Sequence, residues 1–133
     1  MEGLGLLYSD EQVSEAISKS KTVLRKYRQL KIAKRLKIPS VKSPEFSDMP
    51  RGGSGIGNTA LDSYLEIVSQ IDDIERCVAR CELLESILLQ RKYLDDKQYS
   101  FIELVRLSGY EKSRYNIYLR NAYLQFATAY HII

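Results

Sequence analysis

With 133 residues, 44% hydrophobic and 28% charged, the chain suits one soluble domain or a small core with an arm, which excludes a disordered, collagen-like or membrane-spanning protein. Its net charge of +3 combines basic zones at residues 19–38 and 91–133 with an acidic zone at 59–90. Two cysteines and one histidine, Cys77, Cys81 and His131, provide no disulfide scaffold, zinc site or histidine-based triad, so we expect neither an enzyme nor a bound metal or cofactor.

The first segment predicts one amphipathic helix over about residues 10–37. Apolar residues recur at steps of three and four from Val13 to Leu30, Ser9 or Asp10 can cap the start, and Pro39 ends the helix. One helix has no core of its own, so its apolar stripe must meet another surface. The first residues lack the basic start and cleavage site of a secretory signal, and we expect a cytoplasmic protein.

The end of this helix carries a dense positive charge. Residues 19–38 contain nine Lys and Arg and no acid. Such a face can neutralise DNA phosphates, or it can be solvated or paired with the acidic zone of the same chain. Lys31, Lys34 and Arg35 are our candidates for non-specific DNA or partner contacts.

Residues 39–58 predict a linker. They contain all three prolines and four of the seven glycines, and they show neither helical nor strand periodicity. We therefore expect three parts: an N-terminal basic helix at 1–38, the linker, and a helical domain at 59–133.

Two helices are predicted next. The first starts at Asn58 or Thr59 and carries one apolar stripe, made of Leu61, Tyr64, Leu65, Val68, Ile71 and Ile74. After a break near residues 80–82, a second helix is predicted, with Leu83, Leu84, Ile87 and Leu88 on its inner face. The charged Arg91 interrupts this apolar pattern, and the helix ends at Tyr93 and Leu94. Cys77 and Cys81 are predicted to be core or semi-buried thiols. No segment alternates with the period of a strand, so the predicted fold class is all-α.

A short helix, a glycine and a longer helix follow, which is the pattern of a helix-turn-helix over about residues 100–130. Ser100 caps the short helix, Gly109 takes a positive φ, and the longer helix runs from Glu111 to about Ala129. Its predicted inner residues are Tyr115, Leu119, Ala122, Tyr123 and Phe126. The candidates for DNA contact are Lys112, Ser113, Arg114, Asn116, Tyr118 and Arg120, since these residue types can bind base edges and phosphates. Helical bundles that bind no DNA share this pattern, so both interpretations stay open.

The linker contains the segment VKSPEFSDMPRGGSGIGN, between the basic N-terminal helix and residues 85–130, which hold the helix-turn-helix pattern. In these three features the chain resembles the ArpU-like regulators of phages and prophages of low-GC Gram-positive bacteria. The linker resembles that family's KSP-x-x-SDMP segment, the basic N-terminal helix is usual there, and residues 85–130 resemble its helix-turn-helix. The C-terminal half is also similar to region four of sigma factors, through Arg91, Tyr93, Leu94, Glu103, Leu104, Gly109, Tyr110 and Ala122.

The resemblance implies a transcriptional regulator in a bacterial host cell that binds promoter DNA and activates late genes for packaging, structure and lysis. The alternative is a sigma-like or accessory protein that acts through host RNA polymerase and has little DNA affinity of its own. A homodimer that pairs the N-terminal stripes is a further option, and DNA sites in two half-sites would indicate it. We expect no membrane partner.

Overall fold

The computed structural model describes residues 7–38 and 54–133, and only the backbone for 54–58. The elements are α1 (Asp10–Leu36), α2 (Ser54–Arg80), α3 (Leu83–Leu89), the π-helical turn η4 (Gln90–Leu94), α4 (Phe101–Ser108) and α5 (Lys112–Ala129). Every regular element in these ranges is a helix, which confirms the all-α prediction. The SDMP segment and most of the predicted linker lie outside the described residues.

The predicted N-terminal helix is α1. The Ser9 backbone N–H donates to Gln12 Oε1 (2.9 Å), and the Gln12 backbone N–H donates to Ser9 Oγ (3.2 Å), so Ser9 is the N-cap. At 1.5 Å per residue, α1 is about 40 Å long. Its buried residues lie at helical spacing on one face: Val13, Ala16, Ser20, Leu24 and Tyr27.

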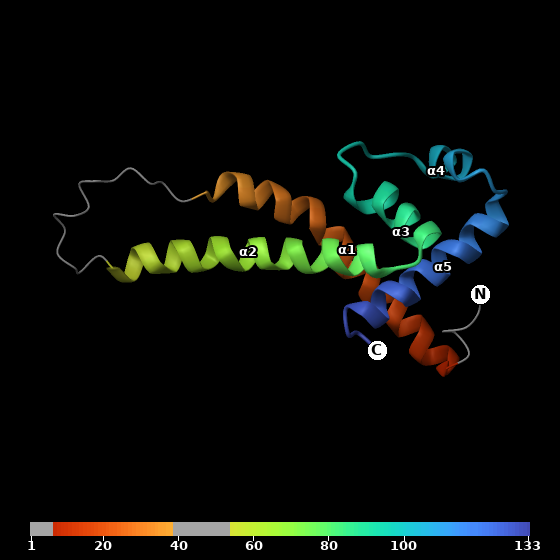
Figure 1. The fold of residues 1–133 in the computed structure, drawn as a ribbon, viewed down its shortest axis with the longest axis horizontal. Coiled ribbons are helices and arrows are strands. Elements are labelled where there is room, and N and C mark those ends of the chain that lie inside the picture. The colour runs from red at the N-terminus through yellow and green to blue at the C-terminus, as the bar shows by residue number, and fades with distance from the viewer. Residues whose placement is uncertain (1–6, 39–53) are drawn as a thin grey trace.

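The apolar stripe of α1 packs against other helices of the same chain. Leu24 and Tyr27 belong to the main core with Ile74 and Phe126, whereas Val13 and Ala16 pack with Leu124 and Ala127 of α5 in a smaller cluster. The buried Ser20 hydroxyl donates to the Tyr123 carbonyl at 3.2 Å. Helix α1 is thus covered by α2 and α5 (Figure 1), and a homodimer that pairs these stripes would have to open this packing.

Helix α2 differs from its prediction at its start and along its stripe. It begins at Ser54, inside the predicted linker. Ile71 and Ile74 are buried, but Leu61 and Leu65 are 44% and 51% exposed, contrary to the predicted inner stripe. The reason is that the first part of α2 projects with the end of α1 away from α4 and α5, and α1 is the one described element that lies beside it (Figure 1).

The predicted break between the next two helices is confirmed at Cys81 and Glu82. The Glu82 backbone N–H donates to Gln125 Oε1 (2.8 Å), and Gln125 Nε2 donates to Glu82 Oε1 (2.9 Å), which joins the break to α5. Leu83 was expected inside and is 78% exposed, while Leu88 and Leu89 are buried. Five of the seven residues of α3 are apolar, so the sequence pattern did not define which side faces the core.

Helix α3 continues into η4, where the Asp95 N–H bonds to the Gln90 carbonyl at 2.8 Å, five residues back. Tyr93 is buried there. Arg91, where the apolar pattern fails, donates from Nη1 to the Leu107 carbonyl at 3.3 Å. This turn therefore connects the core to the end of α4.

Candidate nucleic-acid interface

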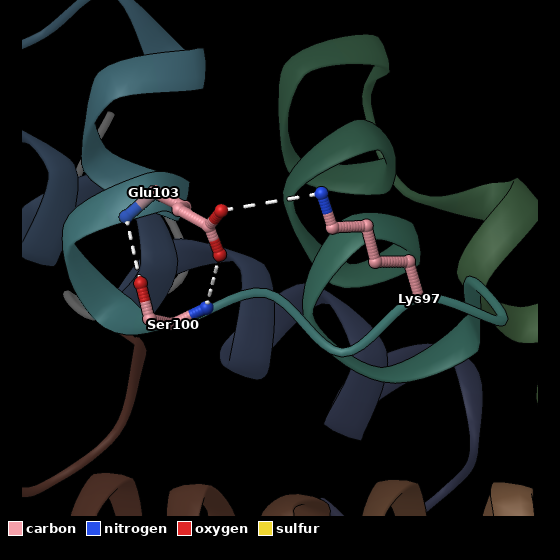
Figure 2. A network of polar contacts seen from close by, with 3 residues as sticks. All are labelled: Lys97, Ser100 and Glu103. Carbon is pink, nitrogen blue, oxygen red and sulfur yellow. Dashed lines mark hydrogen bonds and ion pairs between the residues drawn. The ribbon is translucent and has the colours of Figure 1, made fainter.

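Helix α4 starts with a reciprocal pair of hydrogen bonds, as Figure 2 shows. The Glu103 N–H donates to Ser100 Oγ (3.2 Å), and the Ser100 N–H donates to Glu103 Oε1 (2.9 Å). Lys97 Nζ lies 3.9 Å from Glu103 Oε2. The hydrogen bond from the Ser100 backbone and the charge of Lys97 lower the pKa of Glu103. Ser100 is thus the N-cap, as predicted.

Gly109 makes the turn between α4 and α5. Its φ is +79°, as the sequence predicted, and its N–H donates to the Arg106 carbonyl at 3.2 Å. The Ser108 hydroxyl donates to the Val105 carbonyl (2.6 Å) and accepts from the Tyr110 N–H (3.1 Å). Together with Arg91, these contacts satisfy the polar groups at the end of α4.

The inner face of α5 is as predicted: Tyr115, Leu119, Ala122, Tyr123 and Phe126 are all buried. Phe101 of α4 packs edge-on against Tyr115, with ring centroids 5.8 Å apart and an interplanar angle of 78°. Leu104 is buried beside them. These contacts fix the short helix against the long one.

The outer face of α5 presents five of the six predicted DNA-contact residues to solvent: Lys112, Ser113, Arg114, Asn116 and Arg120. Within the described residues, the side chains of Arg114, Asn116 and Arg120 have no hydrogen bond or ion pair. Lys112 Nζ lies over the Phe101 ring, 5.8 Å from its centroid. The N-cap Glu111 is exposed and makes no side-chain capping bond. The face thus carries two guanidinium groups and one amide, those of Arg114, Arg120 and Asn116, that are available to contact a ligand.

Two further residues complete this outer face. Tyr118, the sixth candidate, is half-buried, and its ring centroid lies 4.9 Å from that of Tyr110, so it stands at the edge of the face rather than free on it. Ile117 is 58% exposed and is not among the contact residues predicted from the sequence. Its position, three residues after Arg114 and four after Ser113, could have placed it on the same face.

The basic candidates of α1 lie elsewhere. Lys31, Lys34 and Arg35 are near the end of α1, which extends along α2 away from α4 (Figure 1). The structure does not bring them beside the outer face of α5. In the part of the chain that the structure describes, no ion pair joins the bases of α1 to the acids of α2. Direct ion pairing with the acidic zone therefore does not occupy these bases.

The cysteines are buried, as predicted. Cys77 and Cys81 are 7% and 9% exposed, both are free thiols, and the Cys81 thiol lies 3.5 Å from the Cys77 carbonyl oxygen. Burial raises the pKa of Cys81 to about 12. Over residues 7–38 and 54–133, no group of three or more His, Cys, Asp and Glu side chains is arranged to hold a metal ion.

Comparison of the chain with protein-family models, curated proteins and solved structures gave no match. Among the described helices, none combines the length and the apolar character that crossing a membrane requires.

Proposed function

We propose that the protein is a DNA-binding transcriptional regulator whose α5 enters the major groove of a duplex. The observation that carries this proposal is the exposed polar face at the start of α5, where Arg114, Asn116 and Arg120 have no hydrogen bond or ion pair within the described residues. The α4–Gly109–α5 unit presents this face. Arginine can bind both acceptors of guanine, and asparagine the acceptor and donor of adenine. Lys112 and Ser113 suit phosphates, which the N–H groups at the start of a helix also favour.

Ile117 adds an apolar contact to this face. Thymine differs from the other bases in the major groove by its methyl group, which apolar side chains contact. Arg114, Ile117 and Arg120 follow one another at steps of three along α5, so they can read neighbouring base pairs.

The biological role rests on the sequence resemblance. The ArpU-like features support activation of late phage or prophage genes for packaging, structure and lysis, from a promoter in a Gram-positive host. Lys31, Lys34 and Arg35 at the end of α1 then add non-specific affinity or a partner surface.

Fluorescence anisotropy tests this proposal by measuring how the protein binds a labelled duplex taken from upstream of the genes that neighbour its own. The measurement is made with scrambled competitor DNA at two salt concentrations. Arg114→Ala should cost ~1–3 kcal/mol on the specific duplex and relax base preference. Lys112→Ala should weaken specific and scrambled duplexes alike and lower the salt slope by about one. Arg76→Ala is the matched control, because Arg76 is exposed on α2 and pairs with Asp73. Equal losses for Arg114→Ala on both duplexes would remove its role in base reading.

A second candidate function is contact with host RNA polymerase, and the surface of α4 favours it. Phe101, Ile102 and Leu107 are 40%, 68% and 47% exposed, which is unusual for one eight-residue helix. A protein that co-purifies with polymerase but binds no duplex alone, and that loses polymerase on Ile102→Ser, would support this function over direct promoter reading.

A further inference from the structure

Three basic side chains from two distant segments meet beside a pair of tyrosines. Lys21 Nζ lies 5.5 Å from the ring centroid of Tyr123, and Lys92 Nζ lies 5.6 Å from that of Tyr93. The two tyrosine hydroxyls are hydrogen-bonded to each other, and the ring centroids are 6.2 Å apart. Arg25 is one turn after Lys21 on α1. We call Lys21, Arg25 and Lys92 the basic cluster.

The basic cluster has no counter-charge. None of its three members forms an ion pair with another described residue. Burial and the positive charges of Lys21 and Arg25 lower the pKa of Lys92, so these groups repel one another across a short distance. Repulsion of this kind is relieved when an anion binds between the cations.

The two segments that carry the cluster are also tied together. Arg28, one turn after Arg25, donates two hydrogen bonds to the Asp95 carbonyl, at 2.8 Å from Nη2 and 3.2 Å from Nε. These bonds tie the end of η4 to α1. Lys92 itself lies within the π-helical turn, a feature that is frequent at functional sites. The two segments that carry the cations are therefore held side by side before any ligand arrives, which reduces the cost of bringing the cations together.

We propose that the basic cluster binds a phosphate group, and that this phosphate belongs to the backbone of the duplex bound by α5. The second half of this inference rests on the proposed function. Arg25 offers a planar guanidinium that can bind two phosphate oxygens, and the lysines add point charges. Arg120 and Tyr123 are one turn of α5 apart, so the cluster borders the end of the outer face. The phosphate contact would fix how the duplex lies on α5 without reading sequence.

The first experiment compares two double variants of equal charge. Lys21→Gln/Lys92→Gln removes two cluster lysines, and Lys19→Gln/Lys26→Gln removes two exposed lysines of α1 outside the cluster. We expect the first to weaken binding of specific and scrambled duplexes by the same factor and to reduce the salt slope by about 0.9, the value for one phosphate. The control should keep the wild-type slope. Equal slopes for both variants and the wild type would overturn the duplex assignment, provided that thermal melting shows all three to be folded.

The second experiment uses inorganic pyrophosphate as the probe and follows the side-chain amine signals of the lysines by NMR. We expect Lys21 and Lys92 to shift and Lys19 and Lys26 to stay in place. Shifts with pyrophosphate but no change of salt slope would assign the cluster to a free phosphate ligand and overturn the duplex assignment. If the wild type binds no duplex, the proposed function fails, and the pyrophosphate titration then tests the phosphate site by itself. In that case, the absence of a shift at Lys21 and Lys92 would overturn the phosphate site.

Discussion

At the scale of single residues, Gly109 decides whether α5 leaves α4 in the right direction. Its φ of +79° belongs to the left-handed region, which residues with a Cβ adopt at a cost. A Cβ built at this position would touch nothing within 4 Å, so space is not the constraint. The backbone conformation alone therefore selects glycine here.

Gly109→Ala should lower the free energy of unfolding by ~1–2 kcal/mol, because alanine must take the left-handed conformation. Gly109→Asn should cost less, since asparagine tolerates this region. Urea unfolding followed by circular dichroism measures both. An alanine variant as stable as the wild type would mean that the turn can adopt another conformation at no cost.

At the scale of the element, α4 depends on its ends. Eight residues are too few for a helix to be stable by itself in water. The Ser100–Glu103 pair satisfies the start, while Arg91 and Ser108 satisfy carbonyls at the end. The exposed face of α5 is thus positioned through a helix that its neighbours stabilise.

The lowered pKa of Glu103 predicts a pH dependence. A carboxyl whose pKa is lower in the folded state stabilises the protein above its unfolded pKa of about 4.3 and loses this contribution as the pH falls through the folded value. Glu103→Gln should therefore melt below the wild type near neutral pH, and the difference should shrink in acid. Glu66→Gln, at an exposed position of α2, is the control. A melting difference independent of pH would contradict the role of this charge.

The elements that the sequence predicted best have local signals. Ser9 and Ser100 identified two helix starts and Gly109 a turn, because capping and positive φ depend on a few neighbouring residues. The exposure of Leu61, Leu65 and Leu83 was not predictable in this way. It depends on where α2 leaves the core and on how the nearly all-apolar α3 is rotated, which are properties of tertiary packing. The helical periodicity of α5 was enough to predict which of its residues face outward. The basic cluster, by contrast, brings together residues of α1 and η4 that are far apart in sequence, so no local pattern indicates it.

At the scale of the whole molecule, α1 is part of the core that supports α4 and α5. Leu24 is 1% exposed and packs in one cluster with residues of α2 and α5. A substitution that destabilises α1 should therefore also destabilise α5.

Leu24→Ala should lower the free energy of unfolding by ~2–5 kcal/mol, through lost burial and the cavity left behind. We expect one cooperative transition, with amide hydrogen exchange accelerated in α5 as well as in α1. Leu36→Ala, at a side chain that is 76% exposed, should change stability by less than about 0.5 kcal/mol. Amide hydrogen exchange that accelerates in α1 alone would show that α1 and α5 unfold independently.

The hydrogen bond between Ser20 and Tyr123 spans 103 residues of sequence, and this separation has a consequence for the order of events during synthesis. Helix α1 leaves the ribosome before α2, and α5, which covers part of its apolar face, leaves after both. At about 5–20 residues per second, that face waits roughly 5–20 seconds for its partner. The part of the α1 face that α5 covers therefore stays exposed after α2 has emerged, and final folding is a step that follows the emergence of α5.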